Sequence, residues 1–146
     1  NVLQAVILTE GDKIILTPTY HVFEMYKVHQ DATLLPVDLD CPDYKSGEDS
    51  IPQISISASK ADNGTIHITL CNLHPHDDIS INCELRGCTI RNVSGRILTA
   101  DKINECNTFD EPERVKPSSF SSYNITEKGL DIKLPAKSVV ALSIEG

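Results

Sequence analysis

Apolar residues follow a period of two over most of the chain. From about residue 38 onward, six runs alternate apolar and polar positions: QISISAS, TIHITLCNL, DISINCEL, CTIRNVSGRILTA, NITEKGLDIKL and SVVALSIEG. Such alternation puts the apolar side chains on one face of a β-strand. Many short strands separated by turn residues predict a mainly β fold, an antiparallel β-sandwich or barrel. The long polar connections CPDYKSGEDS and NTFDEPERVKPSS favour a jelly-roll-like order of the strands.

The same pattern predicts two details of this region. Asn63-Gly64 between two alternating runs indicates a β-hairpin with a type I′ turn, in which both residues have positive φ. In TIHITLCNL the apolar face leaves Cys71 on the opposite side, whereas in DISINCEL Cys83 joins the apolar face. If these two strands pair as a simple hairpin, the two thiols point apart and cannot form a disulfide.

The first 30 residues follow a different pattern, which begins with a continuous apolar run. Residues 2–8 are apolar except for Gln4. A run without alternation is typical of a strand that is covered on both faces. Glu10-Gly11-Asp12 then indicates a turn between two short apolar runs.

A helix is predicted to follow that strand and turn. Thr17 is a suitable N-cap, and Pro18 suits the first helical position because its φ is already fixed near the helical value. The apolar stripe is expected to consist of Val22, Met25, Tyr26 and His29, widened by Phe23. Residues 1 to about 30 therefore read as one β/α unit, which cannot fold alone because its strand lacks partners. We expect this β/α unit to be the end of a larger domain.

Composition and charge exclude some partners. The 146 residues are 40% hydrophobic and 23% charged, which is sufficient for one domain with a real core. The net charge of −8 argues against binding to nucleic acid or to an anionic membrane, because both need clustered Lys and Arg. The chain has no run of about 18 apolar residues, the length that a bilayer-spanning helix needs. We expect no nucleic-acid partner and no membrane partner.

The five cysteines indicate a reducing compartment. An odd number without a C-x-x-C pair fits neither a disulfide framework nor a structural zinc site. Free thiols are the expected state, which favours a cytoplasmic location. Nothing in the sequence requires a cofactor, and we expect none.

One cluster raises the question of a metal. His74-Pro75-His76-Asp77-Asp78 places two imidazoles and two carboxylates within five residues. Metal ligands must converge on one point, whereas a Pro-containing turn splays its side chains. A solvated turn is therefore favoured over a metal site, and we predict no metal ligands. His21 and His29 lie two helical turns apart and cannot chelate an ion together.

Several carboxylates and one amide are candidates for sugar chemistry. Asn104-Glu105 has the form of an Asn-Glu pair that many retaining glycosidases use, but it lies at the edge of a loop in the all-β region. A solvated loop carboxylate is the favoured interpretation, also for Glu111 and Glu113. None of the three is placed to give the paired carboxylates, about 5 Å apart, that a retaining mechanism needs. Gln4 is either a hydrogen-bonded core amide or, if its strand belongs to a β/α barrel, a residue at the active-site end of that strand.

Three stretches make the sequence similar to a known family. NVLQAVILTEGDKIILTPTYHVFEMYKVHQDATLLPV resembles the end of the catalytic domain in the α-L-arabinofuranosidases of glycoside hydrolase family 51, above all at NVLQ and TPTYHVF-MYK. NTFDEPERVKPSSF and the closing LPAKSVVALSIEG resemble the C-terminal sandwich of the same enzymes. The resemblance covers essentially the whole chain in order, and bacterial members look most similar.

The resemblance implies a domain layout and a division of labour. Residues 1–30 would be the last strand and helix of a (β/α)8 catalytic barrel, 31–37 a linker, and 38–146 the C-terminal sandwich. Family members remove terminal arabinofuranosyl groups from arabinoxylan and arabinan fragments with retention, using two barrel glutamates. Both would lie upstream of Asn1, so that this chain holds no catalytic residue and should be inactive alone.

On the family pattern Gln4 is the substrate-contacting residue, and arabinose-containing oligosaccharides are the ligands of the intact barrel. The expected partners of this chain are the upstream barrel domain and further copies of the same chain, since the sandwich supports the barrel and helps to form an oligomer. The alternative is a non-catalytic carbohydrate-binding module. Such modules usually expose aromatic platforms, whereas the sandwich has no Trp and few aromatic residues.

Overall fold

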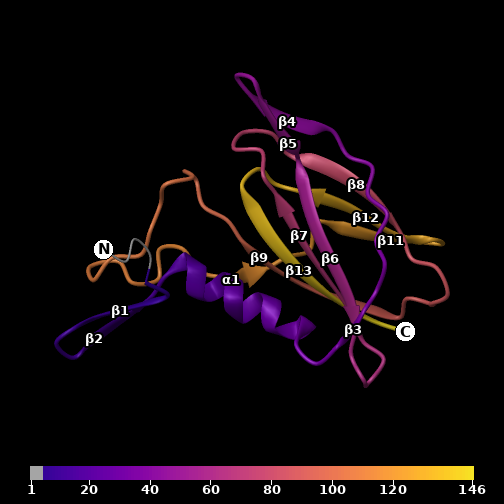
Figure 1. The fold of residues 1–146 in the computed structure, drawn as a ribbon. Coiled ribbons are helices and arrows are strands. Elements are labelled where there is room, and N and C mark those ends of the chain that lie inside the picture. The colour runs from indigo at the N-terminus through magenta and orange to yellow at the C-terminus, as the bar shows by residue number, and fades with distance from the viewer. Residues whose placement is uncertain (1–4) are drawn as a thin grey trace.

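Two antiparallel sheets face each other in the computed structural model, which describes residues 5–146. The larger sheet has the strand order β10-β9-β13-β7-β6-β3, formed by Ser118–Ser119, Asn92–Leu98, Ser138–Glu145, Ile66–Asn72, Ile54–Lys60 and Thr33–Leu34. The smaller sheet has the order β11-β12-β8, formed by Tyr123–Thr126, Gly129–Leu134 and Ile79–Glu84. Figure 1 shows the two sheets as the layers of a sandwich. The predicted β-sandwich is therefore confirmed.

The main core lies between these two sheets. The smaller sheet contributes Leu130, Ile132 and Leu134, and the larger contributes the inward residues of its central strands, Ile54, Ile68, Leu70, Val140, Leu142 and Ile144. Every one of these side chains is at most 2% exposed. Burial of this apolar surface is the main force that holds the sheets together.

The predicted faces of the two cysteine-bearing strands are confirmed, but the strands do not pair. Cys83 packs against the main core from β8, whereas Cys71 lies on the outer side of β7. β7 pairs with β6 and β13, while β8 pairs with β12 in the other sheet. All five cysteines are free thiols.

The hairpin predicted at Asn63-Gly64 is present, with a different turn. β6 and β7 are antiparallel, with Lys60 opposite Ile66. Among the residues described, the only non-glycine residues with positive φ are Asp31 and Lys137, so that Asn63 has negative φ and Gly64 alone, at +90°, is left-handed. The prediction of a type I′ turn was therefore wrong. The Ala61 N–H donates to the Thr65 carbonyl oxygen (2.9 Å), so the loop proper is residues 62–64, one residue longer than a two-residue turn. The Asn63 side chain accepts a hydrogen bond from the Thr65 N–H (3.0 Å).

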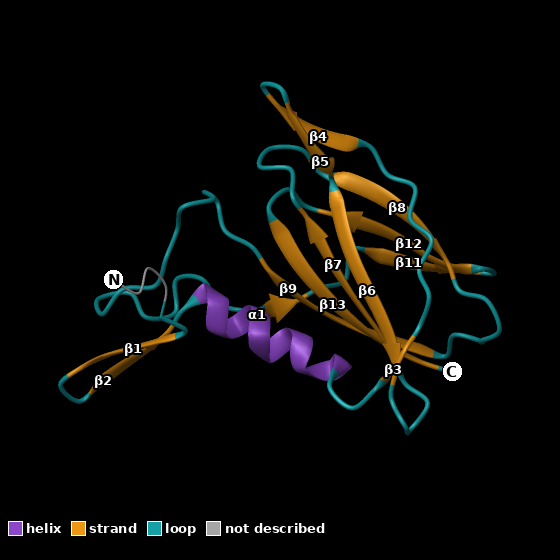
Figure 2. Cartoon of the chain, in the orientation of Figure 1, coloured by secondary structure: helices purple, strands orange, loops and turns teal. Residues whose placement is uncertain are grey.

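The predicted helix is confirmed with its cap. α1 spans Pro18–Tyr26 and continues as a short 3-10 helix, η1, over Lys27–His29. Thr17 is the N-cap. Met25 is 1% exposed, as expected for the apolar stripe. Phe23 is 67% exposed, so the prediction that Phe23 widens this stripe was wrong. α1 lies on the outer face of the larger sheet (Figure 2), where Met25 packs with Leu98 and Val115.

Two small hairpins project from the sandwich. β1 (Ile7–Glu10) and β2 (Lys13–Leu16) are joined by the predicted turn and precede α1. β4 (Asp43–Ser46) and β5 (Asp49–Pro52) form the other hairpin at the far end of the molecule (Figure 1). Residues 31–37, expected as a linker, include β3, which adds to the edge of β6. No helix within residues 5–146 combines the length and apolarity that crossing a bilayer requires.

Candidate functional site

The N-terminal unit is the candidate site because the one predicted substrate contact, Gln4, belongs to it. Gln4 itself lies outside the described residues, as does the whole of NVLQ. The backbone two residues further on is firmly held. The Val6 carbonyl oxygen accepts hydrogen bonds from the Thr17 N–H (3.2 Å) and from the Thr17 hydroxyl (2.8 Å). The same hydroxyl oxygen accepts from the Tyr20 N–H (3.4 Å), so Thr17 joins the start of the hairpin to the start of α1.

A buried amide links this unit to the sandwich. Asn107 is 5% exposed and lies in the long loop between β9 and β10. Its side-chain NH₂ donates to the carbonyl oxygens of Leu16 (2.8 Å) and Val115 (2.9 Å). Its side-chain oxygen accepts from the Val115 N–H (2.7 Å). Asn107 therefore closes its own loop and at the same time holds the end of β2.

Ion pairs stabilise the same loop. Arg114 contacts Glu105 at 3.1 Å and Glu111 at 2.8 Å, and Lys116 contacts Glu113 at 2.7 Å. The Glu105 side chain is only 13% exposed, so it is a paired loop carboxylate and not a solvated one as expected. The hydrogen bond from Lys116 lowers the pKa of Glu113. These carboxylates act as partners of basic side chains in the loop.

Polar contacts fasten α1 and η1 to the outer face of the larger sheet. The Tyr26 hydroxyl contacts the Cys71 sulfur at 3.3 Å, and burial, helped by that contact, raises the pKa of Tyr26 to about 12. His29 Nδ1 lies 2.6 Å from the Ser59 hydroxyl and its Nε2 2.9 Å from the Thr69 hydroxyl. Burial lowers the pKa of His29. The helix is thus bound to the sandwich at several points along its length.

The hairpin side of this unit is apolar and exposed. Ile7 and Leu8 in β1 are 43% and 38% exposed, and Ile14 in β2 is 60% exposed. The described end of the run expected to be covered on both faces, residues 6–8, is therefore exposed in this chain. Phe23, on α1, adds a further exposed aromatic ring. Large exposed apolar side chains grouped on one element indicate a contact with another protein surface.

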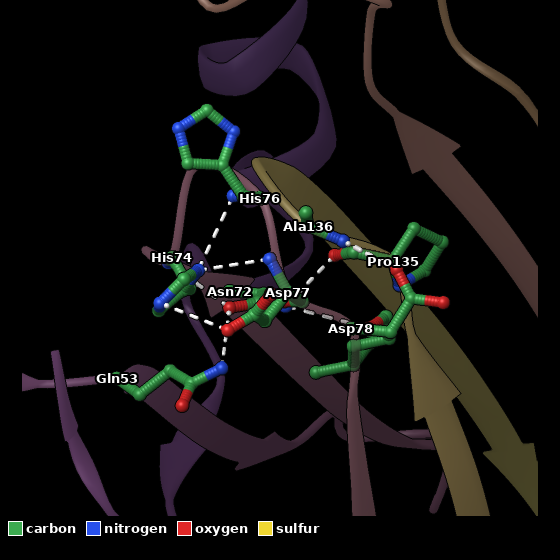
Figure 3. A network of polar contacts seen from close by, with 9 residues as sticks. Gln53, Asn72, His74, His76, Asp77, Asp78, Pro135 and Ala136 are labelled. Carbon is green, nitrogen blue, oxygen red and sulfur yellow. Dashed lines mark hydrogen bonds and ion pairs between the residues drawn. The ribbon is translucent and has the colours of Figure 1, made fainter.

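The histidine-rich turn is a structural cap. Asn72, 2% exposed, lies at its centre in Figure 3: its NH₂ donates to the Asp77 and Pro135 carbonyls (2.9 and 3.0 Å). His74 Nδ1 accepts from the backbone N–H groups of His76 and Asp77. The His76 imidazole points away from the cluster (Figure 3). No group of three or more His, Cys, Asp or Glu side chains that could hold a metal ion occurs within residues 5–146.

The second candidate site is a groove on the outer face of the smaller sheet. Its volume is about 630 Å³, and polar side chains of β8 and β12 such as Asn82, Asp131 and Lys133 line it. Tyr123 is the one aromatic residue among its described lining residues, and its hydroxyl donates to the Val93 carbonyl (2.6 Å). A ring held in this way is not a free stacking platform, so the groove gives little support to the carbohydrate-binding alternative.

Two buried asparagines were not singled out from the sequence. Asn72 is the next-to-last residue of the alternating run TIHITLCNL, and Asn107 begins the stretch NTFDEPERVKPSS, which was interpreted only as a polar connection. Asn107 is followed by Thr108 and then by Pro112. Asn and Thr near a Pro in a polar loop are typical of a local cap, in which a side chain bonds to the backbone of its own loop. The long-range bond of Asn107 to Leu16 has no signal in the sequence, because the two residues are 91 positions apart.

The fold defines a class of domain: an antiparallel β-sandwich that carries a hairpin and a helix before its first sheet strand. The sequence model of the family "Alpha-L-arabinofuranosidase C-terminal domain" matches residues 1–138. The chain belongs to this family, as the C-terminal domain type found in family 51 arabinofuranosidases.

Individual relatives agree with this assignment. The chain is 43% identical to an intracellular exo-α-L-arabinofuranosidase of Bacteroides ovatus, over 99% of this chain and 28% of the relative. It matches the crystal structure of the family 51 arabinofuranosidase of Xanthomonas axonopodis pv. citri with a TM-score of 0.95 and 43% identity, over 99% of this chain and 29% of that one. The structure of a Thermotoga petrophila family 51 enzyme matches with a TM-score of 0.81 at 22% identity, over 96% of this chain and 31% of that one, which shows the fold alone. The chain spans less than a third of the length of these relatives.

Proposed function

We propose that the chain is the C-terminal part of a retaining α-L-arabinofuranosidase that removes terminal arabinofuranosyl groups from arabinoxylan and arabinan fragments. In this proposal residues 1–30 are the last strand and helix of the (β/α)8 barrel, residues 31–37 a linker and residues 38–146 the sandwich. The single observation that carries it is the 43% identity with the Bacteroides enzyme, which runs through the whole chain. Gln4 is proposed to hydrogen-bond the arabinofuranose, on the similarity at NVLQ.

The role proposed for the sandwich is support. Its carboxylates near α1 are occupied in ion pairs, so the two catalytic glutamates are proposed to lie in the barrel, before Asn1. The exposed apolar residues of β1 and β2 would contact the remainder of the barrel or a second copy of the chain. The name of the Bacteroides relative supports an intracellular location for the protein.

Hydrolysis of p-nitrophenyl α-L-arabinofuranoside tests the proposal. We expect no turnover by the 146-residue chain and normal turnover by a longer polypeptide that includes the barrel. Turnover by the short chain would overturn the support role. An inactive longer polypeptide that is folded would overturn the proposed activity. Calorimetric titration of the short chain with arabino-oligosaccharides covers the alternative, since a clear heat of binding would favour a carbohydrate-binding module.

A further inference from the structure

We propose that His29 acts as a pH-dependent latch, which holds the helical segment of residues 18–29 on the sandwich while its imidazole is neutral and loosens that segment in mild acid. This inference is independent of the proposed function and uses described residues alone. It begins from the two nitrogens of the ring. Nδ1 lies 2.6 Å from the Ser59 hydroxyl of β6, and Nε2 lies 2.9 Å from the Thr69 hydroxyl of β7. One side chain of η1 thus joins the segment to two neighbouring strands of the larger sheet.

The neighbouring contacts determine which way the hydrogen bonds of this ring run. Thr69 also hydrogen-bonds the Tyr26 hydroxyl, which in turn contacts the Cys71 sulfur at 3.3 Å. In the described part of the chain, the side chain of Ser59 is bonded to His29 alone. Every hydroxyl hydrogen has an acceptor in one arrangement, in which Ser59 donates to Nδ1 and the Nε2–H donates to Thr69. Thr69 then donates to Tyr26, and Tyr26 to Cys71. This arrangement requires a neutral ring, with one N–H and one lone pair.

A proton on His29 breaks this arrangement at Ser59. The imidazolium ion has two N–H donors and no lone pair, so Nδ1 can no longer accept. The Ser59 hydroxyl must then turn its hydrogen elsewhere, but Ser59 is 3% exposed and too buried to use water instead. A buried donor without an acceptor costs more than an ordinary hydrogen bond contributes. The ring itself is half-buried, so protons can reach it from the solvent. Mild acid therefore weakens the contact of the segment with β6.

No ion pair within residues 5–146 compensates for a proton on this ring. The titratable and charged residues on the elements around it are Glu24, Tyr26, Lys27, Asp31, Lys60, His67 and Cys71. Across the described residues, the one histidine paired with a carboxylate is His74. Burial lowers the pKa of His29, and His67 lowers it further. The surroundings thus agree with the neutral ring that the hydrogen bonds require.

Release of the segment is expected to leave the sandwich folded. None of residues 18–29 is a fully buried member of the main core. The segment is otherwise held by Met25, which is buried against the outer face of the larger sheet, and by the ion pair of Glu24 with Arg96. These contacts lie earlier in the segment, whereas His29 lies at its end. Loss of the His29 contacts should therefore free that end first, while the two sheets stay together.

Three single substitutions separate the possible causes. His29→Gln keeps a donor and an acceptor on a side chain of similar reach but cannot take up a proton. His67→Gln is the matched control, because His67 is another half-buried histidine of β7 that bonds a hydroxyl, that of Ser143 at 3.0 Å, and not the segment. Ser59→Ala removes the hydroxyl that protonation leaves without an acceptor.

Amide hydrogen exchange of the 146-residue chain measures the release. Rates at about pH 7.5 and 5.5, each divided by the rate of an unstructured peptide at the same pH, give the protection of each segment. In the wild type we expect the protection of residues 18–29 to fall roughly tenfold at the lower pH, as for one buried hydroxyl that loses its acceptor. β13 should keep its protection. The fall should be absent in His29→Gln and present in His67→Gln. In Ser59→Ala it should be smaller, with weaker protection at both pH values.

Each other outcome overturns the latch. Equal protection of residues 18–29 at the two pH values in the wild type would show that His29 does not respond to mild acid. An equal fall in β13 would mean that the whole domain loosens and not one segment. A fall in His29→Gln as large as in the wild type, or its loss in His67→Gln, would assign the effect to another group. An undiminished fall in Ser59→Ala would remove the physical basis of the latch.

Discussion

Single asparagine side chains hold the irregular parts of the chain in place. Asn72 joins the end of β7 to the segments around Asp77 and Pro135, and its oxygen accepts from the His74 N–H (3.0 Å) and the Gln53 side chain (3.3 Å). It is buried, so water cannot replace these bonds. Removal of the side chain leaves several buried backbone groups without a partner, which is the costly part of losing a hydrogen bond.

Asn72→Ala is therefore expected to lower the free energy of unfolding by about 2–3 kcal/mol. The corresponding fall in Tm is roughly 10 °C, measured by thermal unfolding followed by circular dichroism. Asn82→Ala is the control: Asn82 also bonds a neighbour, Asp131 at 2.7 Å, but on an exposed strand face. Its effect should stay within about 0.5 kcal/mol. Equal losses for the two variants would contradict the central role of Asn72.

Histidine ionisation should make the chain less stable in mild acid. Burial lowers the pKa of His29, and His67 nearby lowers it further; burial also lowers the pKa of His67. The unfolded chain, whose histidines titrate near about pH 6.5, then binds protons more tightly than the folded chain. Stability is complete above that pH and is lost as the pH falls from about 7 toward the lower folded pKa values.

Urea unfolding at about pH 7.5 and 5.5 measures this effect. The urea midpoint of the wild type should fall between the two. In the double variant His29→Gln/His67→Gln the difference should shrink, since neither site can then take up a proton. The carboxylates with lowered pKa values, such as Glu113, contribute only at more acidic pH. An undiminished difference in the double variant would show that other groups cause the acid sensitivity.

Among the elements, the turn between β11 and β12 has the strictest requirement for glycine. Gly129 has a φ of +154°, and a Cβ at this position would overlap the Cys83 backbone carbonyl of β8. Gly129→Ala thus combines backbone strain with a clash that only a shift of β8 relieves. We expect it to cost about 3 kcal/mol.

Gly47, in the β4–β5 hairpin, is the matched comparison for Gly129. Its φ is +63°, but an added Cβ would meet nothing within 4 Å. Gly47→Ala should cost only about 1 kcal/mol, the strain of a left-handed residue alone. Chemical denaturation of both variants separates strain from clash. Equal costs would mean that β8 moves away easily.

The sequence predicted individual strands and the helix better than it predicted which strands pair with each other. Alternation in TIHITLCNL and DISINCEL gave the inward faces, because the period of a strand is a local property. The assignment of the two strands to different sheets was not predictable, because the Asn72 contacts that redirect the chain between them lie with Asp77 and Pro135. In the same way, Thr17 and Pro18 predicted the start of α1, because a helix cap is a local signal. The contact of Asn107 with Leu16 was not predictable, because it depends on packing that brings distant segments together. The burial of Phe23 was predicted wrongly, because periodicity alone does not show how wide a face of the helix is covered by the sheet.

At the scale of the whole molecule, the sandwich is expected to fold without its first 30 residues. Among residues 5–30, none is a fully buried member of the main core between the two sheets. The segment supplies Met25 to a smaller cluster on the outer face, with Leu98 and Val115. A chain that begins at residue 31 should still unfold cooperatively in denaturant, with stability lower by about 2–5 kcal/mol, as for removal of one buried Met. Loss of cooperative unfolding would show that the sandwich is not an independent domain.

The place of β13 in the larger sheet determines when this sheet can be completed during protein synthesis. β13 is the last strand in the sequence, yet it lies between β7 and β9 and pairs with both. While the ribosome is still adding Ser138–Glu145, β9 and β7 have no strand between them and the larger sheet stays split. Everything that precedes this chain in a longer polypeptide has by then left the ribosome. The sandwich therefore closes only once β13 has been made, and a stop codon within Ser138–Glu145 would leave a nascent protein whose two half-sheets never join.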